Sequence, residues 1–264
     1  MKSSFRHLLV EEKGDVVRVT INRPLDRNSI NSELMKELIE LLEHLEQAGY
    51  RAVVFSGAGE THFIGGADGL EMKRLHPEGA VAFSQRIQAL FARMESSPLI
   101  LVAAIQGLCF GGGYEFALAC DVRLAAEDSR IGLPEVKVGL IPGGGGTQRL
   151  TRLVGQGLAM EMILSGKLYS GHEAGEKGLV HRVLPTDELE AGVQRMLERI
   201  LRQPAYVLPL AKQAVLAACG PEAGAGFQEE SRQFGRCFEH DFFKALMDQQ
   251  LANGQLSTSR SRDT

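Results

Sequence analysis

The N-terminal part of the chain alternates apolar and polar side chains, which is the pattern of strands with one buried face. Residues 6–12 and 15–21 share this alternation and are separated by Lys13 and Gly14, which form a turn signal. They predict two antiparallel strands, and Pro24 closes the second one.

A helical period begins after Asn31, a residue type that favours the N-cap of a helix. The apolar residues that recur at helical spacing are Met35, Leu38, Ile39, Leu42 and Leu45. This spacing predicts a helix that ends by Gly49, followed by a short buried strand at 52–55 and a loop at 56–68.

Strands and helices continue to alternate through the first two-thirds of the chain, and helices take over in the last third. The expected strands are 99–105, 122–125 and 179–184, and the expected helices are 78–96, 114–120, two short helices within 143–165, and helices from Asp187 to about Asn253. Residues 99–105 form a continuous apolar run, which is typical of a buried parallel strand. The order predicts an α/β core with a C-terminal helical region.

Composition and charge exclude several classes of protein. The chain has 264 residues, 44% of them apolar, and a formal net charge of −4, so no basic surface for nucleic acid or an anionic membrane is expected. Four cysteines without a CxxC pair are typical of reduced thiols. There is no apolar run long enough to span a membrane and no signal-peptide core, so we expect a cytoplasmic protein.

A glycine cluster follows the apolar strand at 99–105. Gly111, Gly112 and Gly113 lie before an apolar helix, and Glu115 lies in its first turn. Unpaired N–H groups without neighbouring side chains suit an oxygen that becomes negatively charged. The order of the glycines does not fit the GxGxxG dinucleotide fingerprint, although tight packing of strand on helix is a structural alternative.

Two further stretches carry candidate chemistry. Glu135 follows Pro134 among apolar residues, so it is either a solvated loop charge or a placed acid whose pKa is raised by desolvation. The stretch from His62 to Asp68 contains Gly65 and Gly66 and follows a buried strand, so it can supply a second backbone donor.

Three motifs, FIGGAD, GLCFGGGYE and GLPEVKVGLIPGGGGTQRL, resemble in order and spacing those of the enoyl-CoA hydratase/isomerase (crotonase) family, from about residue 15 to about residue 185. The resemblance implies an α/β fold, a crotonase-like spiral of β-β-α units with a C-terminal helical region. It implies a core with the CoA thioester site at 1–185, a helical trimerisation region at 186–264, and a homotrimer or dimer of trimers.

The resemblance also assigns catalytic roles. It implies that the backbone amides of Ala67 and Gly112 form an oxyanion hole for a thioester carbonyl. Glu115 is expected mainly to activate water and Glu135 mainly to deliver the proton at C2. The pair favours an enoyl-CoA hydratase, a hydro-lyase that adds water reversibly and syn to a 2-enoyl-CoA. The alternatives are an enoyl-CoA isomerase or decarboxylase of the same fold, or a non-catalytic binding subunit.

Substrate contacts are implied for the loops around this site. The expected substrate-binding residues are Arg27, Ser29, Gly65, Asp68, Leu70, Phe110 and Gly111. The segment 27–30 resembles the one that lies along coenzyme A, and Arg23 and Arg27 are either phosphate contacts or surface charges.

Other side chains near these loops keep an alternative. Leu70 and Phe110, with Phe63 and Tyr114, either line an acyl pocket or pack in the core. Asp68 caps the next helix or, as in dehalogenase-type relatives, is a nucleophile. No metal ligand set is recognisable, and we expect no cofactor beyond the coenzyme A of the substrate.

Two features depart from the family pattern. Gly69 stands where an apolar residue is usual, which alters the acyl pocket or the helix that follows. The C-terminal segment from Phe238 lacks the usual basic ending, and it carries an unusual cluster of His240, Asp241, Phe242 and Phe243. This cluster either packs on a neighbouring helix or contributes to an acyl pocket.

Overall fold

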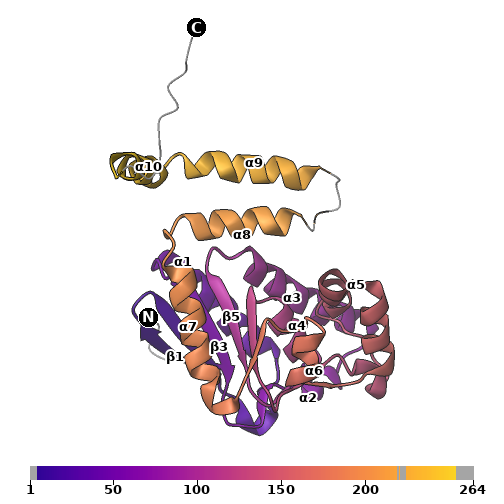
Figure 1. Cartoon of the computed structure of the whole chain (residues 1–264). Coiled ribbons are helices and arrows are strands. Elements are labelled where there is room, and N and C mark those ends of the chain that lie inside the picture. Colours follow the sequence, from indigo (N-terminus) through magenta and orange to yellow (C-terminus); the bar gives the residue numbers. More distant parts are fainter. Residues whose placement is uncertain (1–4, 219, 221–223, 254–264) are drawn as a thin grey trace. The chain divides into compact units, whose positions relative to one another are not determined.

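The computed structural model describes residues 5–218, 220 and 224–253. The chain divides into two compact units, residues 1–203 and 204–264 (Figure 1). The division comes later than the predicted start of the helical region at 186, because the helix at 189–201 belongs to the first unit.

The N-terminal elements form where the periodicity predicts them. Strands β1 (Leu8–Lys13) and β2 (Val16–Ile21) pair antiparallel, and alternate residues of β2 are buried. Helix α1 (Ser32–Gln47) buries one apolar face, and the side chain of Asn31 caps it by accepting the N–H of Leu34.

A six-stranded sheet forms the first layer of the larger unit. Its remaining strands are β3 (Ala52–Gly57), β5 (Ile100–Ile105), β7 (Val122–Ala126) and β10 (Arg182–Leu184), in the order β1-β2-β3-β5-β7-β10. From β2 onward all neighbours are parallel. All of β5 is buried, as expected for a central parallel strand.

A second sheet consists of strands β4 (His62–Ile64), β6 (Leu108–Phe110), β8 (Arg130–Gly132) and β9 (Tyr169–Ser170), in that order. The prediction of a loop throughout 56–68 is therefore wrong, since it contains β4. Strands of two or three residues are too short to show a period in the sequence. Each strand of the first sheet from β3 to β7 is followed by one of the second and then by helix, which is the expected spiral of β-β-α units.

The helices of the larger unit surround these sheets (Figure 1). Besides α1, they are α2 (Gly69–Met72), α3 (Pro77–Ser96), α4 (Gly112–Leu118), α5 (Gly146–Ser165), α6 (Gly171–Glu176) and α7 (Leu189–Leu201), with 3-10 turns at Pro24–Asp26, Glu135–Val138 and Thr186–Glu188. The backbone of α5 is kinked at Gly155, in agreement with the two short helices expected there. Helix α7 packs against β5 and β7.

An aromatic cluster fills the core beside α4. The ring of Phe116 packs edge-on against Phe55, Phe63 and Phe91, with centroid distances of 5.0, 6.2 and 5.9 Å. Such contacts stabilise a core beyond the area they bury. Because Phe91 belongs to α3 and Phe116 to α4, the cluster anchors α4 to α3 and both to β3.

The smaller unit contains α8 (Val207–Ala217), α9 (Ala225–Cys237) and α10 (Phe242–Ala252). Helix α8 packs against α9. The ring of His240 stacks on Tyr206 at 3.7 Å, and the rings of Phe238 and Phe243 meet at 5.5 Å, so part of the unusual C-terminal cluster packs within its own unit. Cys219 and the end of the tail, residues 254–264, lie outside the described residues.

Candidate active site

Three neighbouring strands of the second sheet lead into the three predicted motifs. Strands β4, β6 and β8 are parallel, and their carboxyl ends therefore meet at one edge. Gly65–Ala67 follow β4, Gly111–Gly112 follow β6, and Leu133–Glu135 follow β8. The small sheet is thus what brings together segments that are far apart in sequence.

Two backbone amides converge after β4 and β6. A Cβ atom on Gly112 would lie only 3.1 Å from the amide nitrogen of Ala67. Gly66 has a φ of +96°, a conformation that L side chains rarely adopt. Within the described chain, neither the amide of Ala67 nor that of Gly112 donates a hydrogen bond to another residue. Two amide donors without partners on adjoining loops can stabilise an oxyanion.

The carboxylate of Glu115 is held by a second glycine-rich loop. Its Oε1 accepts hydrogen bonds from the amides of Gly144 (2.8 Å) and Gly146 (2.7 Å), and the residue is only 2% exposed. Burial raises the pKa of Glu115 above its usual value, while the two amide bonds and the Arg149 cation oppose that rise. The roles of Gly144 and Gly146 as holders of Glu115 are not predicted from the sequence, although their run of four glycines is a visible signal.

Glu135 begins the 3-10 turn Glu135–Val138. Its Oε2 is buried, and no described group hydrogen-bonds to it. Burial, and then the charge of Glu115, raise the pKa of Glu135 to about 7, in the direction that the sequence predicts. A Cβ atom on Gly111 would lie 3.3 Å from its Oε1. Glu135 therefore lies against the glycine loop that carries Gly112, as a carboxyl able to hold a proton near neutral pH.

The segment 27–30 lies directly beside the β4 loop. The amide of Gly65 donates to the carbonyl of Arg27 at 2.8 Å. The amide of Ile30 donates to the carbonyl of Gly66, and the carbonyl of Ile30 accepts from the amide of Asp68, each at 2.8 Å. A Cβ atom on Gly65 would lie 2.8 Å from Arg27, so this close approach requires glycine. Arg27 is exposed and Ser29 is buried. The segment predicted to lie along coenzyme A is therefore adjacent to the predicted substrate-binding Gly65 loop.

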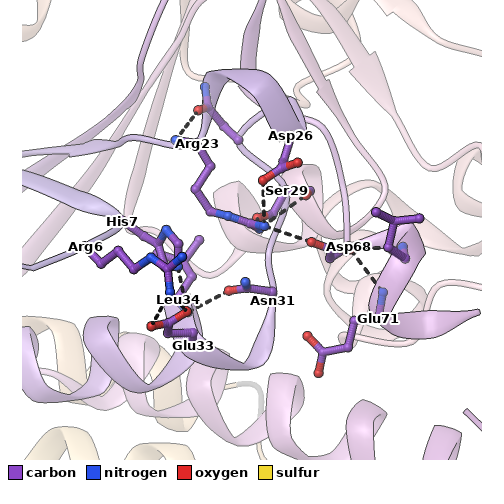
Figure 2. A network of polar contacts seen from close by, with 12 residues as sticks. Arg6, His7, Arg23, Asp26, Ser29, Asn31, Glu33, Leu34, Asp68 and Glu71 are labelled. Carbon is purple, nitrogen blue, oxygen red and sulfur yellow. Dashed lines mark hydrogen bonds and ion pairs between the residues drawn. The ribbon is translucent and has the colours of Figure 1, made fainter. Parts of the chain in front are cut away.

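Asp68 belongs to a polar network around Arg23 (Figure 2). Its Oδ1 accepts the amides of Leu70 and Glu71 and so caps α2, the structural role that the sequence allows for it. Its Oδ2 accepts a hydrogen bond of 2.9 Å from Arg23, which also contacts Asp26 at 2.9 Å. Arg23 is 8% exposed, and its two terminal nitrogens are hydrogen-bonded while its buried Nε has no partner among the described residues, so it is a buried structural residue.

The apolar candidates separate into two groups. Phe63 and Tyr114 are 1% and 0% exposed and belong to the core. Leu70 is 72% exposed and, with Asp68, lines a cleft of about 520 Å³ beside α2. Neither Glu115 nor Glu135 lines this cleft. Phe110 is partly buried, and its ring lies near Gly66. At Gly69 a Cβ atom would meet nothing within 4 Å, so this position is open.

Comparison with known proteins identifies the family. The profile of the enoyl-CoA hydratase/isomerase family matches residues 11–253. The chain belongs to this family. It is 36% identical over 242 residues to the short-chain-enoyl-CoA hydratase of Clostridium acetobutylicum, covering 91% of this chain and 93% of that one.

Solved structures of the family share the fold. An enoyl-CoA hydratase from Bacillus anthracis superposes with a TM-score of 0.87 and 34% identity, over 94% of this chain and 97% of that one. A Thermobifida fusca chain solved in complex with CoA has a TM-score of 0.78 and 29% identity, over 88% and 93%. The predicted crotonase-type fold is thereby confirmed.

Metal-binding clusters and membrane-spanning helices are both absent from the described residues. No group of three histidine, cysteine, aspartate or glutamate side chains in this part of the chain is arranged to hold a metal ion. Among the same residues, every helix is either too short or too polar to cross a membrane.

Proposed function

We propose that this protein is an enoyl-CoA hydratase that adds water reversibly to a 2-enoyl-CoA thioester. The observation that carries the proposal is a pair of carboxyls in different environments, Glu115 buried and Glu135 partly buried. Glu115 is held by two amides, and Glu135 has a pKa of about 7 and a buried oxygen without a partner in the described chain. Carboxyls whose pKa values are shifted by burial and by each other are typical of acid–base sites.

The thioester carbonyl is proposed to bind at the amides of Ala67 and Gly112. As water adds, negative charge develops on this oxygen, and two fixed donors stabilise it more strongly in the transition state than in the substrate. The glycines on either side keep side chains out of the space that the oxygen needs.

The two glutamates are proposed to divide the proton transfers. The oxygen of water bonds to C3 while Glu115 accepts its proton, and Glu135 releases its own proton to C2. One proton then passes from Glu115 to Glu135, so the enzyme returns to its starting state and one water is consumed. Both carboxyls are proposed to act from one face of the enoyl group, which makes the addition syn. The proposed chemistry uses only side chains and amides of this chain, and coenzyme A enters with the substrate.

The substrate contacts remain part of the proposal. We propose that coenzyme A passes along the segment 27–30 and the adjoining Gly65 loop, and that Leu70, Phe110 and Gly111 lie beside the acyl group. The likeness to a chain solved with CoA supports an acyl-CoA ligand. The homotrimer or dimer of trimers implied by the resemblance remains a prediction.

The test is an assay of the purified protein with a panel of 2-enoyl-CoA thioesters, following the loss of the conjugated enoyl absorbance. The wild type should hydrate at least one member rapidly, and Glu115→Gln and Glu135→Gln should each lose several orders of magnitude in kcat. If the wild type binds the thioesters but leaves the enoyl absorbance unchanged, hydration is refuted, and product analysis then distinguishes isomerisation from decarboxylation.

A further inference from the structure

The glycine loop that holds Glu115 is itself held from its other side. The carbonyl of Gly143 accepts hydrogen bonds from Ser84 at 2.7 Å and from Gln88 at 2.8 Å. The carbonyl of Gly144 accepts a hydrogen bond of 2.9 Å from Nη1 of Arg149. The loop thus directs amides at Glu115 and carbonyls at α3 and Arg149.

Arg149 is fixed in place by a bidentate ion pair. Its Nε and Nη2 donate to the two carboxylate oxygens of Glu95 at 2.8 and 2.7 Å, and its guanidinium lies 5.8 Å from the ring centroid of Phe91. The Arg149 side chain is only 12% exposed. A bidentate pair restricts a guanidinium in both position and orientation.

The approach of the loop to Arg149 leaves no spare room. Gly145 has a φ of +99°, and a Cβ atom there would lie 2.3 Å from Nη1 of Arg149. A Cβ atom on Gly144 would lie 2.6 Å from Glu115 Oε2 and 2.9 Å from Phe91. A shift of the guanidinium therefore moves Gly144, and a shift of Gly144 moves the carboxylate of Glu115.

We propose that Arg149, clamped by Glu95, is a positioning residue for the reaction, which orients the Glu115 carboxylate through Gly144. This inference rests on the proposed function for its effect on rate. The cation also lies close enough to favour the ionised form of Glu115. Arg149 touches no reacting atom; it acts only through the loop and through its charge.

The decisive variant is Arg149→Gln. It removes both the hydrogen bond to Gly144 and the cation, so kcat should fall by about 10²-fold, with little change in KM, because a catalytic group is misplaced. The acid limb of the kcat profile should move to higher pH, since Glu115 becomes harder to ionise without the cation. Arg149→Lys should keep the limb near its wild-type position, and Glu95→Gln should lower kcat without moving the limb upward.

Arg93→Gln is the matched control. Arg93 lies on α3, as Glu95 does, and makes a bidentate pair with Glu46 of α1, away from the glycine loop. Loss of this pair should lower the melting temperature and leave the pH profile unchanged. If Arg93→Gln shifts the acid limb as Arg149→Gln does, the effect is general destabilisation and the inference is wrong.

A spectroscopic titration separates this inference from the proposed function. Difference infrared spectra follow the ionisation of the Glu115 carboxyl, which is assigned by its absence in Glu115→Gln, and need no turnover. In Arg149→Gln the Glu115 band should titrate at higher pH than in the wild type. An unchanged titration overturns the inference even if the enzyme is an active hydratase, whereas a shifted titration in a protein without hydratase activity refutes only the proposed function.

Discussion

The carboxylate of Glu115 accepts a hydrogen bond of 2.7 Å from the amide of Gly146, at a place where a side chain on residue 146 would overlap it. A Cβ atom there would lie 2.8 Å from Oε1 and 2.9 Å from Cγ of Glu115, and 3.0 Å from Leu133. The glycine is therefore required by the close approach of the carboxylate and not by its own backbone angles.

Gly146→Ala should therefore impair catalysis through Glu115. The new methyl group displaces the buried carboxylate, and a displacement of about 1 Å at a reacting group costs about 10²-fold in rate. The matched control is Gly157→Ala in the same helix, where a Cβ atom meets nothing within 4 Å. That substitution should stabilise the helix by roughly 0.5–1 kcal/mol and leave kcat unchanged. Steady-state kinetics with thermal melts of both variants make the comparison, and equal activity of the two would contradict this account.

The pH dependence of kcat/KM should show an alkaline limb from the protonated carboxyl. Glu135 has a pKa of about 7 in the free protein and must carry its proton to deliver it at C2, so the rate should fall as the pH rises through this value. Because Glu115 and Glu135 interact, the limb reports the pair as a unit. Initial rates across neutral pH with a substrate of constant ionisation measure it. A profile that stays flat through pH 7 and above excludes Glu135 as the proton donor.

The same carboxyl should make stability depend on pH. The folded pKa of Glu135 lies above the ordinary glutamate value of 4.5, so the folded state binds the proton more tightly than the unfolded state. Stability should therefore fall as the pH rises from about 4.5 to about 7, by at most about 3 kcal/mol before solvent screening reduces the effect.

Glu135→Gln tests this linkage, because a neutral amide of the same shape does not titrate. Chemical denaturation at several pH values should show the variant gaining stability relative to the wild type as the pH rises, with most of the gain complete above pH 7. Glu11→Gln, a change at an exposed carboxylate of β1, is the control and should show no such trend. A constant difference between Glu135→Gln and the wild type would mean that Glu135 titrates normally.

Much of the larger unit could be predicted because its elements are long enough to show a period. The β1–β2 hairpin, α1 with its Asn31 cap and the buried strand β5 all follow from local patterns. The second sheet could not be predicted in this way, since its longest strands have three residues. Yet this sheet aligns the three motifs, so the arrangement of the candidate site depends on elements that are nearly invisible in the sequence.

The polar contacts that fix the loops are also long-range. Arg23 pairs with Asp68 across 45 residues, and Arg149 pairs with Glu95 across 54. No local sequence pattern marks the partners of either pair. From the sequence alone, Arg23 could equally be a charge on the surface. Only the fold brings the end of β2 close to the start of α2, and α3 close to α5. It is this proximity that decides which charges are buried and paired.

Asp68→Asn distinguishes a structural from a catalytic role for this carboxylate. Asparagine retains an Oδ1 that can accept the α2 amides but loses the charge that pairs with buried Arg23. The free energy of unfolding should therefore fall by roughly 1.5–3 kcal/mol.

The effect of Asp68→Asn should also depend on pH. Burial alone would raise the pKa of Asp68, but the hydrogen bonds from Arg23 and the α2 amides lower it overall. The pairing therefore contributes stability above the unfolded pKa, and this contribution is lost as the pH falls through the folded pKa. Denaturation at neutral and acidic pH should show the difference from wild type shrinking in acid, while kcat changes little. Loss of all activity in a folded Asp68→Asn variant would instead identify Asp68 as a group that takes part in the chemistry.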